Sequence, residues 1–325
     1  MPPLTLSIAQ YPTGPTLAAT LISLDEITTA ASLSGVNLIL FPEAFLGGYP
    51  RTCGFGAVVG SRTSEGRDQY YEYWKQAVDL GDSCPDGTGV YHAGAGDGTR
   101  ETLEAIAAKT GVFLVVGLVE KTGGTLYCGC IFVDPVRGVV GKRRKVMPTG
   151  TERVVWGVGS PKTLKAIEAT IAGQKVVLGA AICWENYMPL LRASLYAQGV
   201  SIYLAPTADV RESWISTLRH IAMEGRCYVL GCNQFVTNET LPLYVAQGDK
   251  PGEIVSSGGS AIVDPLGEIV AGPLWRKEGR LDVTIEDLEK SVVRGKMDMD
   301  VGAAGHYARG DVFRLHVEGL DLGRG

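Results

Sequence analysis

The sequence predicts a single α/β domain, and two repeated patterns support this prediction. A helical stretch, Gly-Val and an apolar strand follow one another three times, as "AASLSGVNLILF", "AIAAKTGVFLVVG" and "SLYAQGVSIYLAP". A strand, an Asp-Pro turn and another strand occur twice, as "IFVDPVRGVVGK" from Ile131 and "AIVDPLGEIVAG" from Ala261. Helices that alternate with strands are typical of α/β folds. No linker of low complexity divides the chain.

Glycine and aspartate mark the ends of these elements. Gly35, Gly111 and Gly199 stand where the C-terminus of a helix needs a left-handed residue. The strands that follow are apolar on both faces, as in a sheet covered by helices or by another sheet. Asp134 and Asp264 are interpreted as turn residues of two hairpins. Two α/β halves with similar hairpins predict an internally paired architecture.

The composition excludes several classes of protein. The chain has 325 residues, 45% hydrophobic and 20% charged, so it can form a large core without disulfide bonds. A net charge of −5 argues against a broad surface for nucleic acid. No apolar run approaches the roughly 20 residues that a membrane-spanning helix needs. The N-terminus lacks the pattern of a secretion signal, and the seven cysteines are irregularly spaced, which predicts reduced thiols and a cytoplasmic location.

Cys183 is a candidate nucleophile. Val176 to Ile182 is predicted to be a buried strand, and apolar residues recur at helical spacing from there to Gly199. Cys183 therefore stands at the end of a strand and just before a helix, where free N–H groups and the helix dipole favour a thiolate. A thiolate in this place is a useful nucleophile. A buried structural thiol, the common state of free cysteine, is the alternative.

Glu43 is a candidate general base. It ends the apolar run in "LILFPEAFLGGYP", and ligands of α/β sheets bind at the carboxyl ends of strands. A partly desolvated carboxylate there has a raised pKa and can accept a proton. The following turn would hold the wall of a pocket nearby. A solvated acid, or a neighbour of a helix N-cap, is the alternative.

Four cations occur within five residues at the start of "GKRRKVMPTGTERVVWG", from Gly141 to Gly157. A solvated basic turn is the ordinary interpretation of such a run. One lysine turned inward would instead place a positive charge beside the thiolate and the carboxylate, but the charge pattern does not say which one. Glu152, a few residues later, is another acid that could face the same pocket.

No other motif predicts a metal or an organic cofactor. The four histidines lack the spacing of metal ligands. Cys128 and Cys130 form C-x-C without a second pair, and "GAGDG" at Gly94 lacks the lysine of a P-loop. We therefore expect no cofactor.

Three blocks of the sequence resemble the catalytic blocks of the nitrilase branch of the carbon–nitrogen hydrolase superfamily. They are "LILFPEAFLGGYP", "GKRRKVMPTGTERVVWG" and "AAICWENYMPLLR", and they occur in the family's order. "YLAPTADVRESWISTLRHIAMEGRCYVL" is also similar to that branch, and the resemblance extends from the start of the chain to "GGSAIVDPLGEIVAGPL". The tail departs from the pattern, because Gly310 stands where nitrilases commonly have a proline.

The resemblance implies a four-layer αββα sandwich and a Glu-Lys-Cys triad. Matched block by block, the triad is Glu43, Lys145 and Cys183, and Glu152 matches a second acid beside it. The resemblance thus selects one lysine from the basic run. It also implies that an organic nitrile is converted to a carboxylic acid and ammonia through a covalent thioimidate and acyl-enzyme, without a metal or cofactor.

The substrate is less defined than the triad. We expect the pocket wall to include residues near Tyr49, Trp184 and Pro206, but these residues do not identify the nitrile. The pair Trp184-Glu185 resembles nitrilases more than amidases of the superfamily. Two alternatives use the same triad, namely an amide or carbamoyl hydrolase and a cyanide-hydrating enzyme. A catalytically silent scaffold with a structural cysteine is an alternative of another class.

We also expect self-association to a dimer or a larger homo-oligomer, because the nitrilase branch that the sequence resembles forms homo-oligomers. "YYEYW", from Tyr70, concentrates aromatic residues in a polar segment, and aromatic residues are enriched at interfaces. Tyr187 and Tyr196 lie off the apolar stripe of the helix predicted after the candidate nucleophile. We expect a hydrolase domain at 1–289 and a C-terminal arm at 290–325, with too few apolar residues to dock on its own chain.

Overall fold

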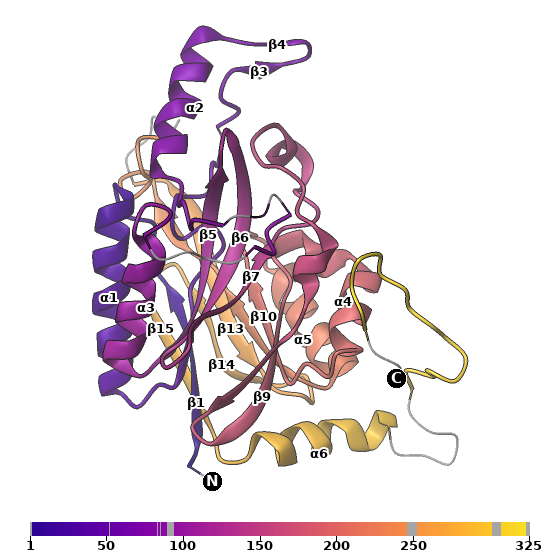
Figure 1. Cartoon of the computed structure of the whole chain (residues 1–325). Helices are drawn as coiled ribbons and strands as arrows, with labels where there is room; N and C mark the ends of the chain where they lie inside the picture. The colour runs from indigo at the N-terminus through magenta and orange to yellow at the C-terminus, as the bar shows by residue number, and fades with distance from the viewer. Residues whose placement is uncertain are drawn as a thin grey trace.

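Two β-sheets face each other, and helices cover the outer face of each sheet (Figure 1). The four-layer αββα sandwich is therefore confirmed. The computed structural model describes residues 2–51, 53–82, 84, 86–89, 94–245, 252–300 and 307–322, with the backbone alone for residues 298–300. His92 and His306, two of the four histidines considered above, lie outside the described residues.

The first sheet has the strand order β15-β1-β2-β5-β6-β7. β1, β2 and β5 are parallel neighbours, whereas the other neighbouring strands are antiparallel. Its strands are β1 (Leu4–Gln10), β2 (Leu38–Leu40), β5 (Phe113–Thr122), β6 (Thr125–Asp134), β7 (Gly138–Arg144) and β15 (Gly279–Ile285).

The second sheet has the strand order β12-β13-β11-β10-β9-β8, and β14 also pairs with β13. β9, β10 and β11 are parallel neighbours. Its strands are β8 (Ile167–Ile171), β9 (Gln174–Ala180), β10 (Ile202–Pro206), β11 (Tyr228–Cys232), β12 (Phe235–Thr237), β13 (Ile254–Val263) and β14 (Ile269–Trp275).

Helices lie outside both sheets (Figure 1). No helix among the described residues is both long and apolar enough to cross a bilayer. The α-helices are α1 (Leu17–Leu33), α2 (Ser64–Gln76), α3 (Thr99–Thr110), α4 (Pro189–Tyr196), α5 (Ser213–Gly225) and α6 (Leu288–Asp300). Helix α2 and the hairpin of β3 (Ala57–Val58) and β4 (Ser61–Arg62) project beyond the sheets.

Three apolar cores hold the layers together. One lies between the sheets and combines Leu6 and Leu40 of the first sheet with Leu178 and Leu204 of the second. Another packs α1 and α3 against the first sheet, and the third packs α4 and α5 against the second sheet. The central strands are therefore apolar on both faces, as the sequence predicted.

The local patterns of the sequence are confirmed. Gly35, Gly111 and Gly199 follow α1, α3 and α4 with φ angles of +79°, +71° and +74°, which only glycine adopts without strain. The two Asp-Pro segments connect the antiparallel pairs β6–β7 and β13–β14. Asp134 and Asp264 accept backbone N–H groups of the residues that follow them in these turns.

The C-terminal segment docks on its own chain, which corrects the expectation from its composition. The expected arm begins within α6, which extends to Asp300. Leu288 and Val292 of this helix belong to the core between the sheets, and Val317 and Leu320 pack against the outer core of the second sheet. A few apolar residues suffice here because residues four apart lie on one face of a helix.

Tyr196 also packs against its own chain, and its place at an interface stays a prediction. Its hydroxyl donates to Glu224 Oε2 at 2.8 Å, and its ring lies 6.2 Å from that of Tyr203. Tyr187 is different, because it is 43% exposed and precedes α4 in a separate 3-10 helix. In α2, Tyr73 is fully buried whereas Tyr71 is 56% exposed, so the aromatic cluster faces both the core and the surface.

The chain passes very close to β5 after it leaves β2. Phe41 N–H donates to Val115 O at 2.8 Å, and Leu46 N–H donates to Gly117 O at 3.1 Å. A Cβ at Gly117 would lie only 1.9 Å from Pro42 O. The segment that carries Glu43 therefore rests directly on the backbone of β5.

Replacing Gly117 by alanine is expected to lower the free energy of unfolding by about 1–3 kcal/mol, because the added methyl displaces the segment after β2. Gly124→Ala is the matched control, since nothing lies within 4 Å of a Cβ built there. Urea unfolding of both variants measures the difference. Equal stability of the two variants would show that the close approach is not a constraint.

Candidate active site

Lys145 lies between two carboxylates in the interior of the sandwich. Its Nζ is 2.7 Å from Glu43 Oε1 and 2.8 Å from Glu152 Oε2. The side chains of Glu43 and Lys145 are fully buried, and that of Glu152 is 7% exposed. Charges removed from water must be paired and hydrogen-bonded to be tolerated. The structure thus joins three of the predicted site residues into one electrostatic unit.

Each member of this unit comes from a different part of the chain. Glu43 lies in the segment that crosses β5, Lys145 directly follows β7, and Glu152 lies in the 3-10 helix η1 (Gly150–Val154). Lys145 N–H donates to Cys128 O at 2.7 Å, so the backbone pairing with β6 continues to this residue. Glu152 Oε2 also accepts the backbone N–H of Thr149 at 2.6 Å. The backbone therefore fixes all three positions.

One carboxylate oxygen of Glu43 remains available to a ligand. Oε1 accepts from Lys145 and also contacts the thiol of Cys128 at 3.5 Å. Oε2 is buried and has no hydrogen-bond partner among the described residues. Burial raises the pKa of Glu43, and the charge of Lys145 opposes this shift. A carboxylate with a raised pKa and an unused oxygen is suited to accept a proton.

Cys183 begins the 3-10 helix η3 (Cys183–Tyr187), shortly after the end of β9. Its φ of +52° lies in the left-handed region, which costs a non-glycine residue about 1–3 kcal/mol. The side chain is buried, and α4 begins only at Pro189. The prediction that Cys183 directly precedes the N-terminus of an α-helix is therefore wrong, because η3 and Met188 separate Cys183 from α4.

Burial favours the neutral thiol of Cys183, whereas its predicted place before a helix favoured the thiolate. Burial, and then the charge of Glu43, raise the pKa of Cys183 to about 12. Lys145 and hydrogen bonds from the Thr207 side chain and the Ala208 backbone lower this pKa to a smaller extent. Because these charges influence one another, the site titrates as a coupled unit. Formation of a thiolate therefore requires a base, and Glu43 is the buried carboxylate whose charge acts on the thiol.

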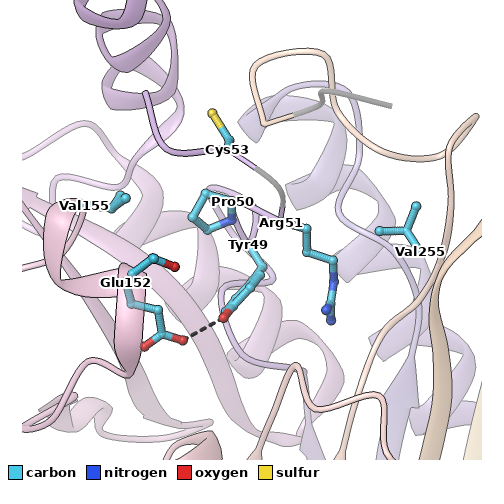
Figure 2. A pocket seen from close by; sticks show the side chains of 8 residues that line it. Tyr49, Pro50, Arg51, Cys53, Glu152, Val155 and Val255 are labelled. Atoms are coloured by element: carbon cyan, nitrogen blue, oxygen red, sulfur yellow. Dashed lines mark hydrogen bonds between the residues drawn. The ribbon is translucent and has the colours of Figure 1, made fainter. Parts of the chain in front are cut away.

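A cavity of about 300 Å³ lies beside Glu152 (Figure 2). Tyr49 Oη donates to Glu152 Oε1 at 2.7 Å and so connects the cavity wall with the buried charges. Of the predicted wall residues, only Tyr49 is among the described residues that line this cavity. Trp184 is 41% exposed, and Pro206 is buried at the end of β10. The lining residues are Tyr49, Pro50, Arg51, Cys53, Thr151, Glu152, Val155 and Val255.

The basic run is buried, so its interpretation as a solvated basic turn is wrong. The side chains of its four cations, Lys142 to Lys145, are at most 2% exposed. Every cation has a buried carboxylate partner, which is what makes burial of the run tolerable. The partners are Glu120 for Lys142 and Arg144, Glu185 for Arg143, and Glu43 with Glu152 for Lys145.

Glu185 joins the end of β7 to the start of η3, a role that the sequence analysis missed. Its Oε2 accepts from Arg143 Nη1 at 2.5 Å and from Ile182 N–H at 2.8 Å. Its Oε1 accepts Val146 N–H at 2.6 Å. The carboxylate thus holds the lysine segment and the cysteine turn at a fixed separation. The available signal was an acid two residues after the candidate nucleophile, which local patterns do not distinguish from a family marker.

Among the described residues, no group of three or more His, Cys, Asp or Glu side chains is arranged to hold a metal ion. Cys128 and Cys130 are buried free thiols on β6.

The sequence as a whole matches a known family. A family model described as carbon-nitrogen hydrolase covers residues 5–295. The chain belongs to the carbon–nitrogen hydrolase family. A nitrilase of Bradyrhizobium diazoefficiens is 47% identical to this hydrolase over 292 residues, which are 89% of this chain and 83% of the relative. An arylacetonitrilase of Trametes versicolor is 44% identical over 313 residues, 93% of this chain and 92% of the relative.

Solved structures share the fold of this carbon–nitrogen hydrolase. The crystal structure of an amidase from Nesterenkonia sp. has a TM-score of 0.61 and 20% sequence identity, and the match covers 88% of this chain and 92% of the amidase. At this identity the likeness shows the shared architecture.

In this carbon–nitrogen hydrolase, Glu185→Gln is expected to lower the free energy of unfolding by about 3–5 kcal/mol, because it leaves Arg143 buried without its counter-ion. Glu65→Gln, at an exposed position in the first turn of α2, is the control. Urea unfolding measures both changes. If the two variants prove equally stable, Glu185 does not hold the segments together.

Proposed function

We propose that this chain is a nitrilase, which hydrolyses an organic nitrile to the carboxylic acid and ammonia. One observation carries the proposal: a buried carboxylate with an unused oxygen, Glu43, is paired with Lys145 and acts electrostatically on the buried thiol of Cys183. The relatives named nitrilase and arylacetonitrilase support the choice of nitriles as substrate.

In the first step, Sγ of Cys183 attacks the nitrile carbon and Glu43 accepts the thiol proton. That proton passes to the nitrile nitrogen, and the product is a thioimidate bound to the enzyme. Negative charge develops on nitrogen during the attack. Lys145 has three N–H groups and uses two for carboxylates, so its third can stabilise this charge.

In the second step, Glu43 activates a water molecule that adds to the thioimidate carbon. The tetrahedral intermediate carries an oxyanion, which Lys145 and the backbone N–H of Trp184 stabilise. The nitrogen takes up both protons of this water, one of them through Glu43, and departs as ammonia, which leaves a thioester. Glu43 then takes a proton from a second water that attacks the thioester, the carboxylic acid is released, and this proton restores the thiol of Cys183. The role of Glu152 is to hold Lys145 in place, through the 2.8 Å ion pair.

The raised pKa of Glu43 has a consequence for the pH range of this reaction. The base must be ionised, so a pKa above the ordinary value of 4.5 moves the loss of activity on the acid side to higher pH. Raising the pH does not ionise Cys183 independently until far above neutrality, because its pKa is about 12. Proton transfer to Glu43 is therefore part of every turnover.

Cys183→Ala is expected to reduce ammonia release from nitriles by roughly a thousandfold or more, because it removes the nucleophile. Cys130→Ala is the control, since this thiol is equally buried and has no part in the mechanism. A panel of aliphatic, arylaliphatic and aromatic nitriles, with cyanide and simple amides beside them, is assayed for acid, amide and ammonia.

The panel also separates the alternatives. Hydrolysis of amides without hydrolysis of nitriles would favour an amidase or carbamoylase, and formamide from cyanide would favour cyanide hydration. Unchanged nitrile turnover by Cys183→Ala would overturn the mechanism.

Self-association is proposed as well, to a dimer or larger homo-oligomer. Exposed apolar residues near the active-site turn support it, since Tyr187 is 43% and Leu190 70% exposed. Burial of such residues by a second copy is favourable. Light scattering during gel filtration measures the mass, and a monomer at micromolar concentration with full activity would overturn the proposal. A weaker assembly of Tyr187→Ala, without loss of stability, is the expected result.

The remaining proposals concern location and domain boundaries. A cytoplasmic location is supported by the free state of all seven cysteines. The division into a hydrolase domain at 1–289 and an arm at 290–325 stays a prediction, and the proposed boundary lies inside α6.

A further inference from the structure

Arg51 brings a positive charge to the wall of the cavity beside Glu152. It follows Tyr49 by two residues, and the two side chains project from the same segment to the same side (Figure 2). Its guanidinium lies over the Tyr49 ring, with 5.0 Å between Cζ and the ring centroid. The same tyrosine donates to Glu152, so Arg51 and Glu152 occupy neighbouring parts of the wall.

The hydrogen bonds of Arg51 leave part of its guanidinium unused. Nη2 donates to Ala208 O at 2.7 Å and to Ser256 Oγ at 3.3 Å. Nε and Nη1 have no partner among the described residues, and neither nitrogen is fully enclosed by protein atoms. These N–H groups are therefore free to bind a ligand, and a guanidinium presents them in a planar fork that matches a carboxylate.

Arg51 is also unusual in its charge balance. Arg143, Arg144 and Arg192 each form an ion pair with a carboxylate, and their pKa values are raised above the ordinary value. The pKa of Arg51 is lowered, chiefly by burial, although nearby acidic groups oppose the shift. Among the described residues, Arg51 donates hydrogen bonds to a neutral carbonyl and a neutral hydroxyl, and not to a carboxylate.

The acids near Arg51 are already neutralised by other donors. Glu43 pairs with Lys145, and Asp209 accepts from Trp184 and pairs with Arg211. Glu152 does not repel an anion strongly either, because it accepts hydrogen bonds from Tyr49, Lys145 and the Thr149 backbone. An anion beside Arg51 would therefore meet a cation whose charge no direct partner balances.

We propose that Arg51 binds the carboxylate of the substrate, and that the substrate class is small cyano acids. This inference rests on the proposed nitrile hydrolysis. The nitrile points to Cys183 and Lys145, and the carboxylate at the other end of a short chain pairs with Arg51. A cavity of about 300 Å³ is at the small end of ligand sites, which suits a short substrate.

A purely structural role would have a different signature. Through Ala208 and Ser256, Arg51 also ties its segment to the second sheet, so its removal could loosen the site for every substrate. A structural role affects charged and neutral nitriles alike. Carboxylate binding affects only the charged one, mainly through KM. A pair of substrates with the same shape therefore separates the two roles.

The test compares 4-cyanobutanoate with 5-oxohexanenitrile, in which a methyl group replaces one carboxylate oxygen. The wild type is expected to show a kcat/KM about tenfold or more higher for the anion. Arg51→Met is expected to lower this value about 10- to 100-fold for the anion and less than about threefold for the neutral nitrile, since a charge-assisted hydrogen bond is lost. Arg51→Lys should retain part of the preference, because it keeps the charge but loses the fork.

Arg62→Met is the matched control. Arg62 donates to the carbonyls of Phe55 and Val154 and does not line the cavity, so its replacement should not change the ratio between the two substrates. Circular dichroism verifies the fold of each variant. If Arg51→Met does not fold, the test rests on the ratio of kcat/KM between the two substrates, measured for the wild type and for Arg51→Lys.

Three outcomes would overturn the inference. They are equal losses for both substrates in Arg51→Met, a wild-type enzyme without preference for the anion, and hydrolysis of other nitriles but not of this pair. Failure of the proposed function looks different, because the wild type would then hydrolyse no nitrile of the wider panel.

Discussion

The buried ion pairs of Lys145 with Glu43 and Glu152 are the constraint on which the rest of the site depends. An ammonium and two carboxylates removed from water would cost several kcal/mol per ion without near-ideal geometry. The fold meets this condition by holding each group on backbone that cannot move freely. Glu43 rests on β5 at Gly117, and the pairing of β6 extends to Lys145.

The same constraint determines the chemistry. Burial, and then the charge of Glu43, disfavour a negative charge on the thiol and raise the pKa of Cys183 to about 12. A resting thiolate is thereby avoided, and the nucleophile forms only as its proton leaves for the carboxylate. The strained backbone at Cys183 places the thiol at the beginning of a turn. Glu185 completes the arrangement, because it fixes the distance between this turn and the lysine segment.

The sequence predicted the features that depend on neighbouring residues. A glycine after a helix and an Asp-Pro turn act within a few positions, so Gly111 and Asp134 could be assigned without knowledge of the fold. The burial of the basic run could not be predicted, because the partner carboxylates Glu120 and Glu185 are 24 and 42 residues away in sequence from Arg144 and Arg143. Lys145 was selected by family resemblance alone, since charge patterns do not distinguish four adjacent cations.

The polar groups left unused in the buried charge cluster and at Arg51 in the cavity wall describe what a ligand must supply. Glu43 Oε2 lacks a donor, Lys145 has a third N–H, and Arg51 has free Nε–H and Nη1–H groups. Buried polar groups are normally satisfied, so the unpaired Glu43 Oε2 indicates a donor on a bound molecule, and the accessible N–H groups of Arg51 are open to an acceptor. The first two call for a group that can give up a proton and develop negative charge near Cys183. The third calls for a fixed anion a short distance away, and a small molecule with a reactive carbon at one end and a carboxylate at the other satisfies all three.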